Sequence, residues 1–249
     1  MSVQSVERAV ALLIASAPGG RSLTELATEV DLPVSTAARL LGTLCELGVV
    51  SREPDGGYGP GAVLQGLAIG MDRTASLRAL TDASLVDLVG VTGETCGMSI
   101  AVGDEVRYIA EVSGSNLIQV REFTNYQLPL HIVSSGLVIL AHWPAALVER
   151  YLEQPLQEFT AKSVIDPALI RTRLDRIRSD GFCWTREEFA EGISSVAAPV
   201  LDFSGTPVAA IHCHGPTFRF DATSDVRIQE AVAAAANGIS AVLGTGAAA

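Results

Sequence analysis

Short hydroxyl side chains and one arginine share a face of a predicted helix near the N-terminus. This helix covers residues 34–47, and the side chains on its polar face are Ser35, Thr36, Arg39 and Thr43. An arginine can donate two hydrogen bonds to the edge of a guanine, and hydroxyl groups can contact phosphates or bases. This chemistry is typical of a helix that lies in the major groove of double-stranded DNA.

Two imidazoles lie close together near the other end of the chain. His212 and His214 are two residues apart along one predicted strand, which begins at about Pro207, so both side chains lie on one face of that strand. Such a pair suits an anionic or hydroxyl-rich small molecule. It could also hold a transition metal, with His131 as a further ligand and Cys96 as the candidate thiolate, or belong to the core without a ligand.

The same histidines indicate catalysis only if a nucleophile lies beside them. Cys96 or Ser195 would have to be activated by His212, and a third group would have to orient the imidazole. The sequence contains no GxSxG, no phosphate-binding glycine loop and no HExxH. We therefore predict no enzymatic activity, no catalytic residues and no cofactor, and a metal-binding sensor built on the two histidines is the alternative.

The chain is long and apolar enough for two compact domains. It has 249 residues, of which 48% are hydrophobic. No run of 18 or more apolar residues occurs, and the N-terminal MSVQSVERAV lacks the apolar core of a signal peptide. The four cysteines show no CxxC spacing, so buried free thiols are expected rather than a disulfide framework. These features predict a soluble cytoplasmic protein that does not contact membranes.

The charge of the chain limits how it can bind DNA. The net charge is -11, and the first 72 residues contain four arginines against eight acidic residues. Affinity for DNA of any sequence depends on counterion release from phosphates, so it should be weak. A few arginines together with helix N-termini can still provide specific binding, and this binding should be sensitive to salt.

Three predicted helices position the hydroxyl and arginine side chains. A helix over 5–17 precedes a second one, whose start is marked by Ser22 and Glu25 at the spacing of a capping box. The turn Asp31-Leu32-Pro33 separates the second helix from the helix over 34–47, because proline disfavours helix in the residue before it. Apolar spacing predicts which side chains these helices bury, among them Val6, Val10, Leu41 and Leu47.

A short hairpin follows the third helix, which Gly48 ends. Its two strands meet at the turn Asp55-Gly56-Gly57. Arg52 and Tyr58 lie on this hairpin and join the predicted DNA-contacting residues. Helix, turn, helix and hairpin in this order predict a winged helix-turn-helix domain.

The remainder of the chain predicts a second domain in which helices and antiparallel strands have no βαβ repeat. A helix over 62–80 with a break at Gly70 precedes it, and a helix from Ser84 begins it. The predicted strands cover 96–102, 106–112, 118–123, 193–201 and 207–213, and the later helices lie at 137–141, after Asp166-Pro167, and around 228–242. On the second strand, Val106, Tyr108, Ala110 and Val112 are expected to share one face.

Two blocks of sequence resemble one known family. The string STAARLLGTLCELGVV, followed by the hairpin and LQGLAIG, is similar to the DNA-binding domain of the IclR family of bacterial transcriptional regulators. The block REEFAEGISSVAAPVLDFSGTPVAAIHCHGP, at 186–216, resembles the effector-binding domain of that family. The two blocks have the family's spacing, so the resemblance covers nearly the whole chain.

The resemblance implies an α+β protein that acts as a ligand-responsive regulator. Residues 1–70 would form the winged helix-turn-helix domain, 71–82 a linker helix, and 83–249 a GAF-like effector-binding domain with an antiparallel sheet. Its partners would be double-stranded operator DNA, a small-molecule effector and further copies of the chain, as a dimer or tetramer. A repressor is the commoner outcome in the family, and an activator is the alternative.

The resemblance also implies an effector-binding pocket. The family places there the loop after a PLH-like segment, a position that is often cysteine, two positions just before a Gly-Pro, and a position that can be acidic. With Met98 and His131, the residues assigned to this pocket are Ser134, Ser135, Thr185, Ser195, His212 and His214.

The chain departs from the family's usual residues at several of these positions. His212 and His214 replace residues that are often serine, Ser195 replaces a frequent cysteine, and Leu137 a usual lysine. In the hairpin, Gly59 stands where the family generally has a basic residue, so one contact with DNA should be missing. Imidazoles and hydroxyls without an acidic group at Thr185 predict a small carboxylic acid as the effector, such as a catabolic intermediate.

Overall fold

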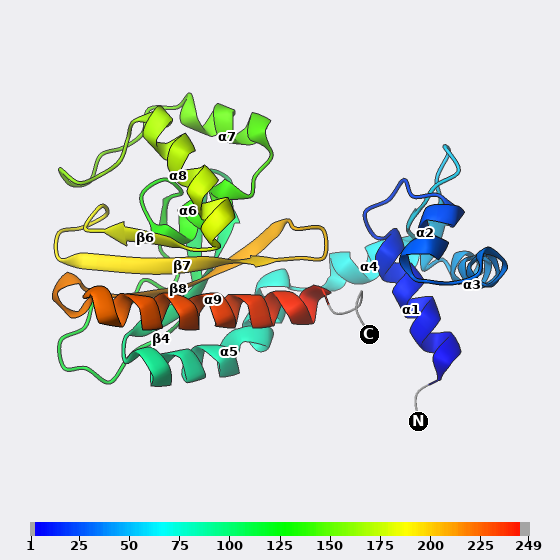
Figure 1. The fold of residues 1–249 in the computed structure, drawn as a ribbon, viewed down its shortest axis with the longest axis horizontal. Helices are drawn as coiled ribbons and strands as arrows, with labels where there is room; N and C mark the ends of the chain where they lie inside the picture. Colours follow the sequence, from blue (N-terminus) through cyan, green and yellow to red (C-terminus); the bar gives the residue numbers. More distant parts are fainter. Residues whose placement is uncertain (1–2, 245–249) are drawn as a thin grey trace. The chain divides into compact units, whose positions relative to one another are not determined.

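The computed structural model describes residues 3–244 and divides the chain into two units between Arg73 and Thr74 (Figure 1). Each unit has its own apolar core. The first contains the N-terminal helices and a small hairpin, and the second contains a six-stranded sheet with helices on both faces.

The first unit is a winged helix-turn-helix, as predicted. Its elements are α1 (Gln4–Ser16), α2 (Leu23–Glu29), α3 (Val34–Glu46), the hairpin strands β1 (Val50–Arg52) and β2 (Tyr58–Pro60), and α4 (Ala62–Gly70). The three helices and the hairpin enclose a small core of buried side chains. The members of this core are Leu12, Ala15, Leu26, Ala27, Ala37, Leu41 and Val50.

The local signals for these elements act as the sequence indicates. Ser22 and Glu25 form a reciprocal capping box, in which the Ser22 backbone N–H donates to the Glu25 carboxylate over 2.8 Å. Gly48 ends α3 with a φ of +69°, which glycine adopts without steric cost. Arg52 pairs with Tyr58 across the antiparallel hairpin, and Gly56 provides the turn at φ +90°.

The buried face of α1 differs from the predicted one. Val6 and Val10 are 58% and 44% exposed, whereas Leu12 and Ala15 are buried. Apolar residues occupy nearly every side of this helix, so periodicity alone does not select the face that packs on α2 and α3. Leu47 is also exposed, because it follows the end of α3 instead of lying on its buried stripe.

One long helix replaces two predicted ones at the start of the second unit. After α4 the chain is extended at Met71, which confirms the break near Gly70. The helix α5 (Arg73–Thr92) then continues through the predicted linker and through the helix expected from Ser84. Leu77, Leu85 and Leu88 are all buried along it, so a single apolar stripe favours a continuous helix.

The sheet of the second unit is antiparallel throughout, in the strand order β5-β4-β3-β8-β7-β6. Together with its helices it confirms the predicted α+β class. The strands are β3 (Thr95–Val102), β4 (Glu105–Val112), β5 (Gln127–Pro129), β6 (Cys183–Arg186), β7 (Ile193–Leu201) and β8 (Pro207–Pro216).

Both faces of this sheet are covered by helices (Figure 1). The helices α6 (Ser134–Ala141), α7 (Ala145–Leu152) and α8 (Pro167–Asp180) pack on one face, which we call the α6 face. The helices α5 and α9 (Ala222–Gly244) pack on the other, which we call the α9 face. Within residues 3–244, none of the helices is long and apolar enough to cross a membrane.

Three parts of the second unit differ from expectation. The predicted strand over 118–123 is irregular, with Leu117 and Ile118 exposed, because β4 takes Gln127–Pro129 as its edge partner instead. The helix α7 and the strand β6 were not predicted. At the end of α9 Val242 is exposed, although Ile228, Val232 and Ile239 are buried as the spacing indicates.

Candidate functional site

The outer face of α3 presents the predicted DNA-contacting side chains. Ser35, Arg39 and Thr43 are exposed and Thr36 is half-buried, while Ala37 on the opposite side is fully buried. Across the part of the chain that is described, no acidic side chain forms an ion pair with Arg39. Pro33 precedes the helix without a side-chain cap, so first-turn N–H groups of α3 can bind a phosphate.

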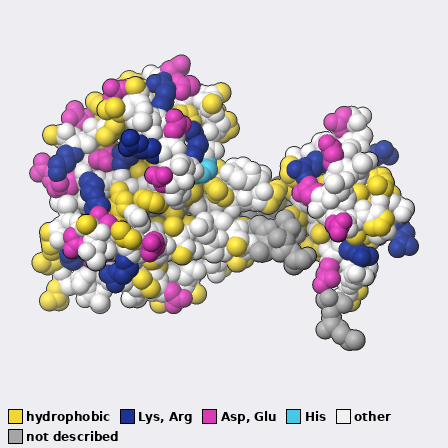
Figure 2. Space-filling view, in the orientation of Figure 1, with side chains coloured by type: hydrophobic (Ala, Val, Ile, Leu, Met, Phe, Trp, Pro, Cys, Tyr) yellow, Lys and Arg dark blue, Asp and Glu magenta, His cyan; other side chains and the backbone are white. Residues whose placement is uncertain are grey.

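The hairpin supports α3 with two further residues of the predicted set. Arg52 is exposed, and its guanidinium lies 5.9 Å from the centroid of the Tyr58 ring. Tyr58 is half-buried against the core of the first unit, so part of its role is structural. On the face shown in Figure 2, the Lys and Arg side chains of this unit are separated and interspersed with Asp and Glu.

Packing explains why a glycine follows Tyr58. A Cβ atom at Gly59 would lie 2.3 Å from a carboxylate oxygen of Glu53 and 3.5 Å from the Cα of Gly19. Glu53 in turn accepts a hydrogen bond from the N–H of Gly20 over 3.0 Å. A basic side chain therefore cannot occupy position 59 unless this contact between the hairpin and the loop after α1 is rearranged.

A small, largely enclosed cavity of about 20 Å³ lies on the α6 face of the second unit. This is room for about one water molecule. Its wall is aromatic and aliphatic on one side, with Tyr108, Phe123 and Phe189 as the largest members. Five polar side chains complete the wall, namely Ser134, Thr185, Ser195, His212 and His214.

Four of the five polar side chains come from two neighbouring rows of the sheet, and Ser134 comes from α6. Thr185, Ser195 and His214 are cross-strand partners on β6, β7 and β8. In the adjacent row, His212 of β8 lies opposite Gly97 of β3, which lies opposite Glu111 of β4. Residues that are distant in sequence therefore meet on one face because antiparallel pairing aligns them.

Three hydroxyl groups form a chain along one side of the cavity. Ser195 lies in the middle, with its Oγ 2.9 Å from the Oγ of Ser134 and 2.7 Å from the Oγ1 of Thr185. Hydroxyls both donate and accept hydrogen bonds, so this chain can reorient around a bound polar group.

The helix α6 begins at the cavity. Val133, at its N-cap, provides no side-chain cap, and both Val133 and Ser134 line the cavity. The first N–H groups of a helix lack intrahelical acceptors and carry a partial positive charge, which favours an anion. A Cβ atom at Gly136 would lie 2.3 Å from the carbonyl oxygen of Leu130, so this helix start packs directly on backbone.

A β-bulge in β4 determines which of its side chains reach the cavity. Met98 pairs with Ala110 and Ser99 with Tyr108, so Ile109 is an extra residue on β4. Beyond the bulge the alternation of side chains shifts by one. Tyr108 and Glu111 consequently share the α6 face, whereas Ala110 packs against the α9 face, contrary to the prediction that Tyr108 and Ala110 share a face.

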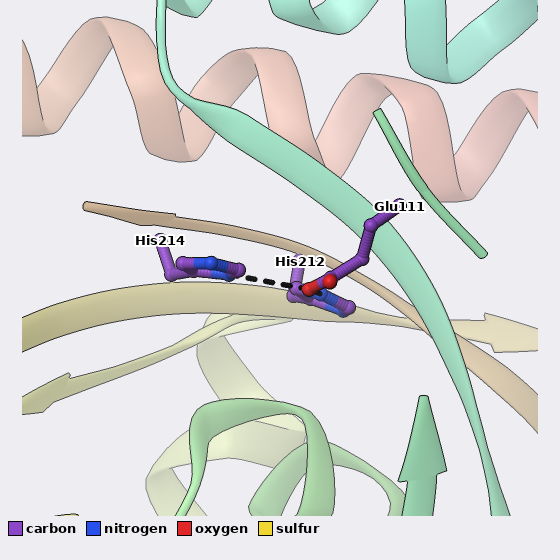
Figure 3. A group of neighbouring side chains, drawn as sticks. All are labelled: Glu111, His212 and His214. Atoms are coloured by element: carbon purple, nitrogen blue, oxygen red, sulfur yellow. Dashed lines mark ion pairs between the residues drawn. The ribbon is translucent and has the colours of Figure 1, made fainter. Parts of the chain in front are cut away.

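The bulge brings Glu111 to the two histidines (Figure 3). Its Oε1 lies 3.5 Å from Nε2 of His212 and 3.7 Å from Nδ1 of His214. All three side chains are buried, with at most 4% of their surface exposed. The two imidazoles stack at an interplanar angle of 15°, with their centroids 5.8 Å apart.

Neighbouring groups orient this cluster. The Phe123 N–H donates to Oε2 of Glu111 over 2.5 Å, which leaves Oε1 facing the histidines. Ser99 Oγ lies 3.4 Å from Nδ1 of His212, which leaves Nε2 facing Glu111. A Cβ atom at Gly97 would lie 2.7 Å from both the Glu111 Cγ and the His212 Nε2, so glycine is what allows the two side chains to meet.

Burial and charge shape the titration of the site. Burial would raise the pKa of Glu111, but the two histidines and the Phe123 N–H outweigh it, so its pKa is lowered and it stays ionised. Burial, together with the charge of His212, lowers the pKa of His214 to about 4 despite Glu111. Burial raises the pKa of Tyr108, so its phenol stays neutral. At neutral pH the site therefore holds a carboxylate beside a neutral His214.

Four residues assigned to the site or its alternatives lie elsewhere. Met98 and Cys96 point to the α9 face, because β3 alternates regularly and the histidines face the other way. His131 is buried, with Nδ1 2.8 Å from the Tyr151 hydroxyl and Nε2 3.0 Å from the Gln157 carbonyl oxygen. Ser135 is buried inside the first turn of α6 and does not line the cavity.

Met98, His131 and Ser135 therefore do not line the cavity that the other residues assigned to the pocket share, and Cys96 lies on the other face of the sheet from His212. The sequence reasoning also missed members of the site. Glu111, Tyr108 and Phe123 were not assigned to it. The available signal was Gly97 within a strand, since glycine there often marks a close approach.

Burial of His131 makes stability depend on pH. Burial lowers its pKa below the ordinary 6.5, although the Gln157 carbonyl and Glu188 act in the opposite direction. The unfolded chain therefore takes up the proton first, and the free energy of unfolding falls as the pH drops below about 6.5. We expect the loss between pH 7 and 5, measured by urea unfolding, to be smaller in His131→Asn than in the wild type. Equal losses would contradict this role.

Two family profiles match the chain. The profile described as the IclR helix-turn-helix domain matches residues 5–54. The profile described as the C-terminal domain of the bacterial transcriptional regulator IclR matches residues 72–241. Together they cover both units.

Individual proteins are similar over almost the same length. The HTH-type transcriptional regulator BhcR of Paracoccus denitrificans is 32% identical over 231 residues, which cover 91% of this chain and 81% of BhcR. The HTH-type transcriptional repressor AllR of Klebsiella pneumoniae is 30% identical over 247 residues, covering 97% and 90%. The crystal structure of an IclR transcriptional regulator from Silicibacter sp. TM1040 has a TM-score of 0.75 at 26% identity, covering 98% and 96%.

Proposed function

We propose that this chain, which belongs to the IclR family of bacterial transcriptional regulators, represses its target genes until a small carboxylic acid enters the cavity of the second unit. The chain is a ligand-responsive, DNA-binding regulator. The direction of control, the class of effector and the residues that carry each step are our proposal. A similar protein, AllR of Klebsiella pneumoniae, is named a repressor.

The DNA-binding surface consists of the outer face of α3 and the hairpin. Ser35, Thr36 and Thr43 contact phosphates and base edges, while Arg39 reads a guanine. Arg52 and Tyr58 hold the hairpin against the sugar-phosphate backbone of the DNA next to the major groove. One such module buries too little surface for specificity, so the protein binds a palindromic operator as a homodimer or homotetramer. It does so in the cytoplasm.

One observation carries the choice of a carboxylate effector. The N-terminus of α6 and the hydroxyls of Ser134, Thr185 and Ser195 converge on the same cavity. A carboxylate can accept hydrogen bonds from the first-turn N–H groups and from the hydroxyls at once. The hydroxyls would then turn away from one another and donate to the ligand.

The small size of the cavity links effector binding to a change in structure. A carboxylic acid is larger than the water-sized space of about 20 Å³, so aromatic side chains such as Phe123 and Phe189 must move to admit it. A ligand that binds only the opened form shifts the population toward that form. The same shift lowers operator affinity when the opened form binds DNA less tightly, and it would produce activation if the preference were reversed. No step of this scheme transforms the ligand.

Fluorescence anisotropy with a labelled duplex from the DNA immediately upstream of the gene tests this function. Preference for this duplex over a scrambled one establishes an operator. Small carboxylic acids are then titrated against their primary amides, which have nearly the same shape without the charge. We expect at least one acid to weaken operator binding by about tenfold or more, or 1.4 kcal/mol, and its amide to have no effect.

A variant pair assigns the effect to the cavity. Thr185→Val keeps the shape of the side chain but removes a hydroxyl from the chain around Ser195. We expect it to require a higher acid concentration for release from the operator. Thr172→Val, on the exposed surface of α8, is the matched control and should behave as the wild type. Acids and amides acting equally would refute carboxylate recognition, whereas equal binding to both duplexes would place the operator elsewhere.

A further inference from the structure

We propose that Glu111, His212 and His214 bind one divalent transition-metal ion, and that this ion presents an open coordination position to the cavity, where the effector carboxylate binds. The metal site stands on the geometry of these residues alone. Only the role of the open position rests on the proposed function.

The donor atoms have the spacing that a metal requires. One donor atom from each of the three side chains can be chosen so that all three lie within 4.8 Å of one another. Glu111 Oε1 lies 3.5 Å from one imidazole nitrogen and 3.7 Å from the other. Ligands about 2.0 Å from a tetrahedral zinc ion lie roughly 3.3 Å apart, so contraction by a few tenths of an ångström suffices.

Three buried atoms of these side chains lack hydrogen-bond partners. Within residues 3–244, Glu111 Oε1, His212 Nε2 and His214 Nε2 are buried and have no hydrogen-bond partner. Unpaired buried polar atoms are rare, and a buried carboxylate oxygen without a donor is especially unfavourable. A metal bound by Glu111 Oε1, His212 Nε2 and one ring nitrogen of His214 would remove at least two of these three deficits.

The surroundings resemble the second shell of a metal site. Metal-binding histidines usually make a hydrogen bond through the other ring nitrogen, and metal-binding carboxylates are usually held by a donor. His212 Nδ1 lies 3.4 Å from Ser99 Oγ, and Glu111 Oε2 accepts the Phe123 N–H over 2.5 Å. These contacts leave His212 Nε2 and Glu111 Oε1 facing each other, and both side chains lie over Gly97.

The charge that Glu111 and a divalent ion would carry together suits an anionic ligand. One carboxylate ligand and one divalent ion have a net charge of +1, so the site would attract an incoming carboxylate from the cavity. The acid can then complete the coordination shell while its second oxygen reaches the hydroxyls of Ser195 and Thr185.

The donor set selects the class of metal. Two imidazoles and one carboxylate suit zinc, iron, cobalt, nickel or copper, and they do not suit magnesium or calcium, which prefer oxygen ligands. Three protein ligands with a further open position are the pattern of zinc sites that bind an exogenous molecule. We therefore assign Zn²⁺ to the site and use Co²⁺ as its spectroscopic substitute.

The direct test is titration of the protein with Co²⁺ after treatment with a chelator. We expect one Co²⁺ per chain, the visible d–d absorption of a site with few ligands, and displacement of Co²⁺ by Zn²⁺. Glu111→Gln and His212→Gln should each lose this absorption. His142→Gln removes a histidine that is hydrogen-bonded to the Val138 carbonyl at the end of α6, so this control should keep it.

Far-UV circular dichroism and urea unfolding verify that the second unit of each variant is folded. Failure of the wild type to bind either Co²⁺ or Zn²⁺ overturns the metal site without a variant. Wild-type absorption in both Glu111→Gln and His212→Gln also overturns it, since the metal would then lie elsewhere. In either case the response to the acid could persist, so the proposed function would survive.

A second titration tests the open position. The acid identified in the operator assay is added to metal-free and to Zn²⁺-loaded wild type. We expect the metal-free protein to need at least about ten times more acid for release from the operator. Equal responses would overturn the role of the metal in effector binding. If the metal binds as expected and no acid acts on either form, the metal site stands and the carboxylate effector fails.

Discussion

Arg39→Ala will remove the preference of this regulator for its operator over a scrambled duplex. The Arg39 side chain is exposed on α3 and makes no ion pair within the described residues, so its loss leaves the fold intact. A bidentate contact with a guanine contributes about 1–3 kcal/mol of discrimination. The dimer that we propose would lose two such contacts, or about 2–6 kcal/mol. Fluorescence anisotropy with both duplexes measures this loss.

Arg176→Ala is the matched control for charge. Arg176 is exposed on α8 in the other unit, and its removal changes the net charge by the same amount. It should leave the preference unchanged. An Arg39→Ala protein that still prefers the operator would remove Arg39 from the base-reading residues, whereas equal losses in both variants would indicate an effect of net charge alone.

Gly136→Ala will strongly destabilise the second unit. A Cβ atom there would lie 2.3 Å from the carbonyl oxygen of Leu130 and 2.6 Å from its Cα, and both atoms belong to the backbone. The start of α6 must therefore move away from Leu130, which loosens a helix whose residues are all buried. We expect a loss of about 3 kcal/mol in the free energy of unfolding, at the upper end for overpacking. Urea unfolding measures it.

Gly90→Ala makes the same chemical change in an exposed part of α5. Among the described residues, no atom outside its own helix lies within 4 Å of the added Cβ, so only the helical preference of alanine remains. This control should be stabilised by up to about 1 kcal/mol. If Gly136→Ala and Gly90→Ala change the free energy of unfolding by the same amount and in the same direction, the start of α6 moves away from Leu130 at little cost.

Local signals predicted much of the fold because they act within a few residues. The capping box of Ser22 and Glu25, the glycine end at Gly48 and the start at Asp166-Pro167 all appear where the sequence indicates. The order of the first unit's elements follows from them. The buried face of α1 did not follow, since its apolar residues offered more than one face and only tertiary packing selects among them.

The candidate site was only partly predictable, for a physical reason. Ser134, Thr185, Ser195, His212 and His214 line one cavity, as their assignment to one pocket requires. Glu111 could not be found in this way, because strict alternation along β4 places it on the opposite side from Tyr108. The extra residue at the bulge reverses that assignment, and its position depends on pairing between strands rather than on the sequence of β4 alone.

The enclosed cavity also has a consequence in time. An effector that fits only after aromatic side chains move cannot bind faster than the cavity opens, whatever its concentration. The rate of response would therefore level off at the opening rate, and the subsequent closing over the ligand would slow its escape. Such a regulator would respond little to an effector that is present only briefly. After prolonged exposure, it would keep the effector bound for some time once the free concentration falls.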